Sequence, residues 1–151
     1  MTPVRIRFLG ILLCWCPVAL AGPTIADAVD PTGHCLNYDD STVTLSGTVF
    51  SRIYFGPPNY GENPESDARE GAWLILLDAP ICITGSSNPK VDNDLPESNQ
   101  ILIHLVAVHV DLASLQRAAG KHITVRGSLF HAMTGHHRTP VLMDVYEVRV
   151  P

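Results

Sequence analysis

The stretch that decides the fold is VTLSGTVFSRIYF, residues 43–55. Apolar side chains recur here at every second position and alternate with threonine, serine and arginine; the apolar ones are Val43, Leu45, Val49 and Ile53. A period of two residues is typical of a strand with one face buried and one face in water. Gly47 lies inside the stretch, where a bend or bulge of a strongly curved sheet is expected. The stretch therefore predicts a curved β-strand.

Further strands and one short helix are predicted on the C-terminal side of this stretch. Strands are expected at 72–83, 99–108, 122–132 and 140–150. The segment 110–120 has helical spacing instead, with Asp111 as its N-cap and Gly120 at its exit. Five strands with a helix between the third and the fourth predict an all-β, five-stranded, OB-fold-like Greek-key barrel. A small β-sandwich is the alternative.

The first residues have the pattern of a secretory signal peptide. Arg5 and Arg7 precede an apolar run, and small residues at Ala19 and Ala21 suit signal peptidase, so cleavage is expected near Ala21. The apolar run is shorter than a transmembrane helix, which needs about 20 residues. These features predict a periplasmic or secreted protein without stable membrane insertion. Lipid attachment to a cysteine of the leader is the less favoured alternative.

Removal of the leader, residues 1–21, leaves two of the four cysteines, Cys35 and Cys82. In an oxidising compartment such a pair is most simply a disulfide, with free thiols or metal ligands as the alternatives. The polar segment 22–42, broken by prolines and a glycine, is predicted to be an irregular N-terminal arm. The remainder, 43–151, is long enough for one barrel domain with a modest core.

The charge balance excludes one class of partner. The chain has 10 Lys and Arg residues against 15 Asp and Glu residues. The predicted leader contains two of the arginines and none of the acids, so the mature chain is still more acidic. Nucleic-acid binding requires clustered basic side chains to neutralise phosphates, and no such cluster is present in the sequence. Nucleic acid is therefore not an expected partner.

Four blocks of the mature sequence resemble one family of exported bacterial proteins. They are CLNYDDSTVTLSGT (35–48), FGPPNY (55–60), WLILLDAPICI (73–83) and GSLFHAMTGHHRTPVLMDV (127–145). The family is the domain of unknown function DUF4431. The resemblance implies an exported protein in which the two cysteines and a histidine-rich turn recur, and it implies no known activity. Relatives often carry a third histidine after TGHH, where this chain has Arg138.

Two unusual loops form the candidate ligand face. In OB-folds the loop between strands one and two and the loop between strands four and five flank the same binding face. In this chain they are GPPNYGENPESDAREG (56–71) and the histidine-rich segment 131–139. The predicted ligand-binding residues are Tyr54, Phe55, Asn59, Tyr60, His131, Thr134, His136, His137 and Arg138. We therefore predict a non-enzymatic binding or inhibitory module of the bacterial cell envelope, which binds an envelope protein or a small envelope ligand and needs no cofactor.

A metal site is the alternative function. Zinc or copper could be held by His131, His136 and His137. Carboxylates of the facing loop are candidate further ligands, namely Glu62, Asp67 and Glu70. Against this hypothesis, adjacent residues of an extended chain point apart, and the spacing matches no strong metal-binding motif.

An enzyme is less favoured than either function. A histidine acting as general base would need a nucleophile nearby, and the candidates are Tyr60, Thr134 and Thr139. No Gly-x-Ser-x-Gly elbow is present in the sequence. A further alternative is that the histidines only form a structural turn and bond to backbone groups.

Overall fold

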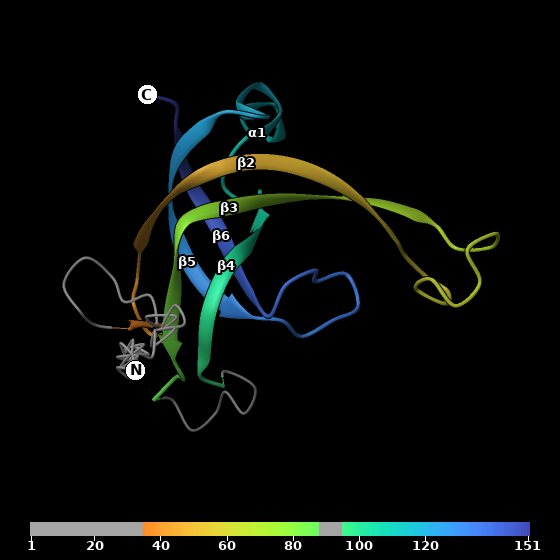
Figure 1. Cartoon of the computed structure of the whole chain (residues 1–151), viewed down its shortest axis with the longest axis horizontal. Helices are drawn as coiled ribbons and strands as arrows, with labels where there is room; N and C mark the ends of the chain where they lie inside the picture. Colours follow the sequence, from red (N-terminus) through yellow and green to blue (C-terminus); the bar gives the residue numbers. More distant parts are fainter. Residues whose placement is uncertain (1–34, 88–94) are drawn as a thin grey trace, which may run out of the picture.

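The computed structural model describes residues 35–87 and 95–151. The predicted signal peptide and the first part of the predicted arm, residues 22–34, lie outside the described residues. Figure 1 shows the elements of the described part along the chain. They are β1 (Leu36–Asn37), β2 (Val43–Phe55), β3 (Arg69–Thr84), β4 (Glu97–Val106), α1 (Leu112–Ala118), β5 (His122–His131) and β6 (Val141–Arg149).

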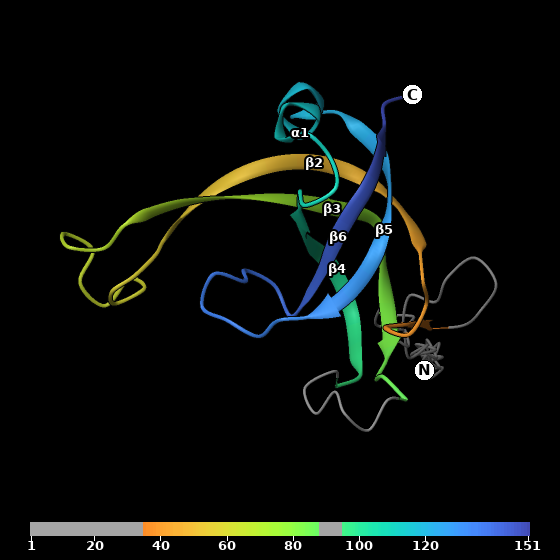
Figure 2. The same cartoon turned by 180° about the vertical axis from the view of Figure 1, so that it is seen from behind.

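Strands β2 to β6 close into a barrel, which Figures 1 and 2 show from opposite sides. β2 pairs in antiparallel fashion with β3 and with β5, β3 with β4, and β5 with β6. The ring is closed by parallel pairing of β4 with β6 at His104–Val106. This order, with α1 between β4 and β5, is that of the predicted OB-fold-like barrel. The predicted all-β class with one short helix is confirmed.

The bounds of the predicted elements shift by a few residues. β3 already begins at Arg69, so the loop that follows β2 is shorter than the predicted 56–71. The helix is also shorter than predicted, and Asp111 caps it by accepting a hydrogen bond from the backbone N–H of Ala113 at 3.1 Å. The short strand β1 lies in the segment expected to be irregular, where it pairs in parallel with the end of β3.

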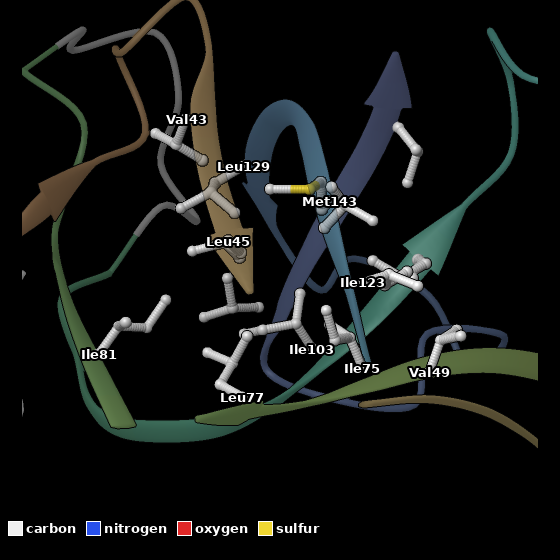
Figure 3. Packing of buried hydrophobic residues seen from close by; sticks show 14 of the residues in the cluster. Val43, Leu45, Val49, Ile75, Leu77, Ile81, Ile103, Ile123, Leu129 and Met143 are labelled. Atoms are coloured by element: carbon white, nitrogen blue, oxygen red, sulfur yellow. The ribbon is translucent and has the colours of Figure 1, made fainter. Parts of the chain in front are cut away.

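Alternating side chains of the barrel strands form the core. Figure 3 shows Leu45, Leu77 and Ile103 pointing toward one another inside the barrel. The largest fully buried side chains are Leu74, Ile75, Ile83, Ile103, Leu115, Ile123, Leu142, Met143, Val49, Val125, Val141 and Val145. Ile53 continues the apolar alternation of β2 but is 64% exposed. It lies on a part of β2 that extends past the barrel.

Two strand glycines lie where backbones cross closely. A Cβ atom at Gly47 would overlap the carbonyl oxygen of Leu76 and lie 2.8 Å from the Cα of Leu77. At Gly127 it would overlap the carbonyl oxygen of Asp144, next to a register shift between β5 and β6. Any side chain here would push the paired strands apart. The bend predicted at Gly47 therefore lies where only glycine fits, and the same holds at Gly127.

Cys35 and Cys82 form the predicted disulfide. It links residues 47 positions apart in the sequence and attaches the segment before β1 to the end of β3. A loop of this length stabilises a fold by about 4 kcal/mol in the chain-entropy model. A structural disulfide points to an oxidising, extracytoplasmic compartment. Within residues 35–87 and 95–151, no helix has the length and apolar character needed to cross a membrane.

Alanine substitutions at two glycines test the close crossing. Gly47→Ala is expected to lower the free energy of unfolding by about 3 kcal/mol or more, because the new methyl group collides with backbone rather than with a movable side chain. Gly71→Ala is the matched control, since its Cβ would meet only the Cδ1 atom of Ile53, at 3.8 Å. Urea unfolding of both variants measures the difference, and equal stability of the two would contradict the assigned role of Gly47.

Candidate functional site

β2 and β3 extend beyond the barrel as a two-stranded ribbon. β2 pairs with β5 only as far as Thr48, and β3 pairs with β4 only from Trp73 onward. The two strands nevertheless stay paired with each other out to Phe55 and Arg69. Figures 1 and 2 both show that this ribbon and the β5–β6 loop leave the barrel on the same side. The two loops predicted to flank a ligand face thus lie on one side of the molecule.

The loop at the tip of the ribbon, residues 56–68, is organised around the carboxylate of Asp67. This side chain is only 7% exposed. It accepts hydrogen bonds from the backbone N–H groups of Asn59 at 2.8 Å and Gly61 at 2.6 Å. Burial would raise the pKa of Asp67, but these bonds, together with one from the backbone of Asn63, hold the pKa below its ordinary value. Asp67 therefore remains ionised and orders the loop from within.

The β5–β6 loop, residues 132–140, is a closed turn. Its ends are joined by a bond of 2.8 Å from the N–H of Ala132 to the carbonyl of Pro140. Inside it, the N–H of His137 donates to the carbonyl of Thr134, and Nδ1 of His137 accepts from the N–H of Met133 at 2.8 Å. One ring nitrogen of His137 is thus engaged in shaping the turn.

This turn lies against the outer surface of the barrel. The N–H of Arg138 donates to Nδ1 of His104 on β4 at 3.3 Å, and the hydroxyl of Thr139 accepts from the N–H of His104 at 3.0 Å. Leu74 and Leu142, the register neighbours of His104, are fully buried although they are outside the barrel core. The loop and the outer faces of three strands therefore form a second, thin layer of packing.

A partly buried ion pair joins the ribbon to the 132–140 loop. The carboxylate of Glu70 on β3 accepts a hydrogen bond from the guanidinium of Arg138 and lies 2.9 Å from Nδ1 of His136. Arg138 also donates to the carbonyl of Gly135 at 2.9 Å. Its side chain is only 9% exposed. A charge so far removed from water is stable only when it is paired and hydrogen-bonded, and Glu70 meets that need.

Aromatic contacts extend this junction. The guanidinium of Arg138 lies 5.0 Å from the ring centroid of Tyr54, within the range of cation–π attraction. The rings of Tyr60 and His136 meet edge to face with centroids 5.9 Å apart. A Cβ atom at Gly135 would lie 2.8 Å from the Tyr60 ring. The ring of Tyr60 therefore rests directly on the backbone of the facing loop.

A segment of the chain that includes the 132–140 loop matches a known protein family. Residues 102–149 match the family model of a domain of unknown function (DUF4431). The resemblance predicted from the sequence is thereby confirmed over the second half of β4, α1, β5, the 132–140 loop and the whole of β6. No curated protein and no solved structure shows a significant similarity to the chain.

Some predicted ligand-binding residues meet at the junction and others do not. Tyr54 and Tyr60 from the ribbon contact Arg138 and His136 from the DUF4431 segment. Asn59 instead bonds to Asp67 within its own loop. The remaining predicted residues have other local partners: Phe55 lies under the guanidinium of Arg69, 3.9 Å from it, and Thr134 Oγ1 accepts from the N–H of His136. Some of the predicted ligand-binding residues therefore form the junction of the two loops, and others hold their own loop in shape.

The three histidines of the metal hypothesis point to different partners. His131 lies at the end of β5, with Nε2 3.1 Å from Glu97 and Nδ1 3.0 Å from the carbonyl of Ala132. His136 faces Glu70, and His137 bonds within its own turn. Among the described residues, no group of three or more His, Cys, Asp or Glu side chains is placed to hold a metal ion. Shared ligation of one ion would require the turn to rearrange.

The structure brings to the site two residues that no sequence pattern indicated. Glu97 holds His131, and His104 supports the histidine-rich loop from β4. Burial, followed by the nearby His137 and Arg138, lowers the pKa of His104 from 6.5 to about 4. An outward-facing histidine opposite apolar neighbours on the paired strands was the available signal for this role. The loop that folds over it could not be deduced from sequence spacing.

Removal of the Asp67 carboxylate tests the organisation of the ribbon loop. Asp67→Ala is expected to speed amide hydrogen exchange at Asn59 and Gly61 by about tenfold or more, because both N–H groups lose their acceptor. Glu65→Ala, in the same loop and exposed, is the control. Exchange followed by NMR or mass spectrometry measures the effect. Unchanged exchange in Asp67→Ala would show that the loop is ordered by other contacts.

His104 makes folding stability depend on pH. Its pKa is lower in the folded protein than in the unfolded chain, so the unfolded state binds the proton more tightly. The stabilisation is therefore complete above about pH 6.5 and is lost as the pH falls toward 4, by up to about 3 kcal/mol. His104→Gln retains an acceptor but cannot titrate, and it should flatten this slope. Urea unfolding between pH 7 and 4.5 measures it; identical slopes in both proteins would exclude His104 as the cause.

Proposed function

We propose that this protein is an exported, non-enzymatic binding module of the bacterial cell envelope that recognises another envelope protein. Its binding surface is formed by the ribbon loop and the 132–140 loop where they meet. We call this the two-loop surface and define it by its exposed side chains: Pro57, Pro58, Tyr60, Met133 and His136. The observation that supports the proposal is that these side chains are exposed while the charged groups that hold the loops already have partners within the protein. Asp67 accepts backbone N–H groups, and Glu70 pairs with Arg138.

The division between frame and surface supports recognition of a partner. Glu70 and Arg138 bond to each other within the frame. Tyr60, His136 and Met133 are left 45%, 55% and 65% exposed. Tyrosine and methionine are enriched in protein interfaces, and loops that are ordered before binding lose less entropy when a partner arrives. Such a surface is suited to tight contact without large conformational change.

A protein is favoured over a small ligand as the partner. Small molecules bind in concave pockets of about 300–1,000 Å³. A hollow of about 40 Å³ in the described part of the chain lies elsewhere, on β2, β5 and β6. It is lined by Thr44, Thr124, Arg126, Glu147 and Arg149. The two-loop surface instead presents exposed side chains from two projecting loops, which suits a binding or inhibitory module.

The proposed location rests on several observations of different kinds. The Cys35–Cys82 disulfide requires an oxidising environment to form and persist. The leader sequence before Gly22 has the pattern of a signal peptide. The match of residues 102–149 to DUF4431 adds the exported bacterial context that the resemblance implies. An envelope protein is thus the class of partner that the chain would meet.

Site-specific photocrosslinking tests the proposal. A photoreactive phenylalanine analogue replacing Tyr60 should form a discrete adduct with an envelope protein in the living bacterium, because this ring is central to the two-loop surface. The same analogue at Leu112, which is equally exposed but lies on α1, is the control. Excess wild-type protein should suppress the Tyr60 adduct about tenfold more strongly than the Tyr60→Ala, His136→Ala double variant. Identical adducts at both positions, or none at Tyr60, would refute the proposal.

The zinc or copper alternative requires a separate measurement. Elemental analysis of the mature protein, purified without a histidine tag, reports bound metal after dialysis against either ion. Near-stoichiometric metal that disappears in His136→Ala would replace the proposed function with a metal-dependent one. Metal retained by that variant would place the ion away from the two-loop surface.

A further inference from the structure

The edge of β2 facing away from β3 carries unpaired backbone groups where the ribbon leaves the barrel. Val49 makes the last bonds on this edge. Its N–H donates to the carbonyl of Lys121 at 3.1 Å, and its carbonyl accepts from the N–H of Gly120 at 2.8 Å. Backbone groups of a strand point to alternate edges. Ser51, Ile53 and Phe55 therefore point their N–H and C=O groups in the same direction as Val49.

No described strand pairs with this edge beyond Val49. The ladder with β5 ends at Thr48, and the opposite edge of the ribbon strand is occupied by β3. Figures 1 and 2 agree that β3 is the only described element alongside β2 in the outer part of the ribbon, and it lies on the opposite edge. Ser51, Arg52 and Ile53 are exposed. Prolines, bulges and charged side chains, especially lysine, commonly protect such edges. Residues 50–55 contain no proline and no lysine, and Arg52 is their one charged residue.

We infer that a second copy of this chain pairs with this edge, antiparallel, about a two-fold axis at Ile53. In this register Ile53 lies opposite Ile53 of the second copy, and Ser51 lies opposite Phe55. All of these residues point their backbone groups outward, so each facing pair can exchange both of its N–H···O=C bonds. A contact between identical patches closes on itself as a dimer.

The side chains favour a second copy over an unrelated strand. With Ile53 at the centre, Arg52 of one chain lies opposite Tyr54 of the other. Within a single chain the Arg52 guanidinium already lies 5.2 Å from the Tyr54 ring, so cation–π contact across the axis repeats an interaction that these side chains make. Like charges that face each other directly would destabilise the pairing, and this register contains none. The exposed Ile53 side chains are buried against each other.

Pairing with a second copy would also stabilise the ribbon. A two-stranded ribbon is marginally stable in water, and additional strands stabilise it. Two ribbons joined at β2 form a four-stranded sheet. The dimer then carries two copies of the two-loop surface, which would strengthen binding to a partner with repeated sites. The inference does not depend on the proposed function, because the edge belongs to the ribbon whatever the two-loop surface binds.

Sedimentation velocity of the disulfide-bonded mature protein, from about 1 to 200 µM, tests the inference. Wild type is expected to dimerise. Ile53→Pro removes the central outward N–H, and its ring blocks a facing strand, while the ladder with β3 does not use that N–H. This variant should have a dimer dissociation constant at least about tenfold higher than wild type. Ile53→Thr keeps the N–H and the β-branched shape, so it should remain within about threefold of wild type.

Hydrogen exchange of the wild type keeps the test decisive even if Ile53→Pro fails to fold. The amides of Ser51, Ile53 and Phe55 should become protected as the concentration rises, whereas those of Arg52 and Tyr54 face β3 and should be protected throughout. Four results would overturn the inference. They are a monomer at all concentrations with unprotected edge amides, a dimer with unprotected edge amides, a dimer that Ile53→Pro leaves intact, and edge amides that are protected only when a different protein is added.

Discussion

The rest of the structure depends on the close crossing of β2 and β3 at Gly47. At this point the carbonyl of Leu76 occupies the space that a side chain would need. The close approach lets β2 pair with β5 at one end and with β3 along the other, so that the strands curve into the barrel that β4 and β6 complete. It also directs the outer half of β2 away from the barrel. The ribbon, its loop and its unpaired edge all follow from this curvature.

Buried charges determine how the two loops are arranged. Asp67 orders the ribbon loop by accepting backbone N–H groups, and the pair of Glu70 with Arg138 joins that loop to the DUF4431 segment. Such groups add little net stability, because desolvation offsets most of their attraction. They exclude other arrangements, however, since each alternative would leave a buried charge without its partner. The exposed side chains of the two-loop surface are thereby held in one geometry before any partner binds.

Histidines act in two opposite ways in this fold. Four of them face carboxylates from distant parts of the sequence: His109 with Asp144, His122 with Asp78, His131 with Glu97 and His136 with Glu70. Each of these contacts becomes an ion pair when its imidazole is protonated. His104 differs, because protonation would end its acceptance of the Arg138 N–H and place a charge in an apolar layer. Acid conditions that protonate His104 are therefore expected to weaken the contact between the 132–140 loop and β4.

The sequence by itself determined the elements and the covalent frame. The period of two in Val43, Leu45 and Val49, the cap at Asp111 and the paired cysteines are local or chemical signals, so the barrel class, the helix and the disulfide could be predicted. Convergence of the two loops followed from the predicted fold. The partners of individual side chains did not: no local pattern indicated that Asp67 orders the ribbon loop, and Ile53 continued a buried pattern but is exposed. Only the tertiary structure decided these roles, because they depend on groups as far apart as Glu70 and His136, 66 positions along the chain, which local sequence patterns do not specify.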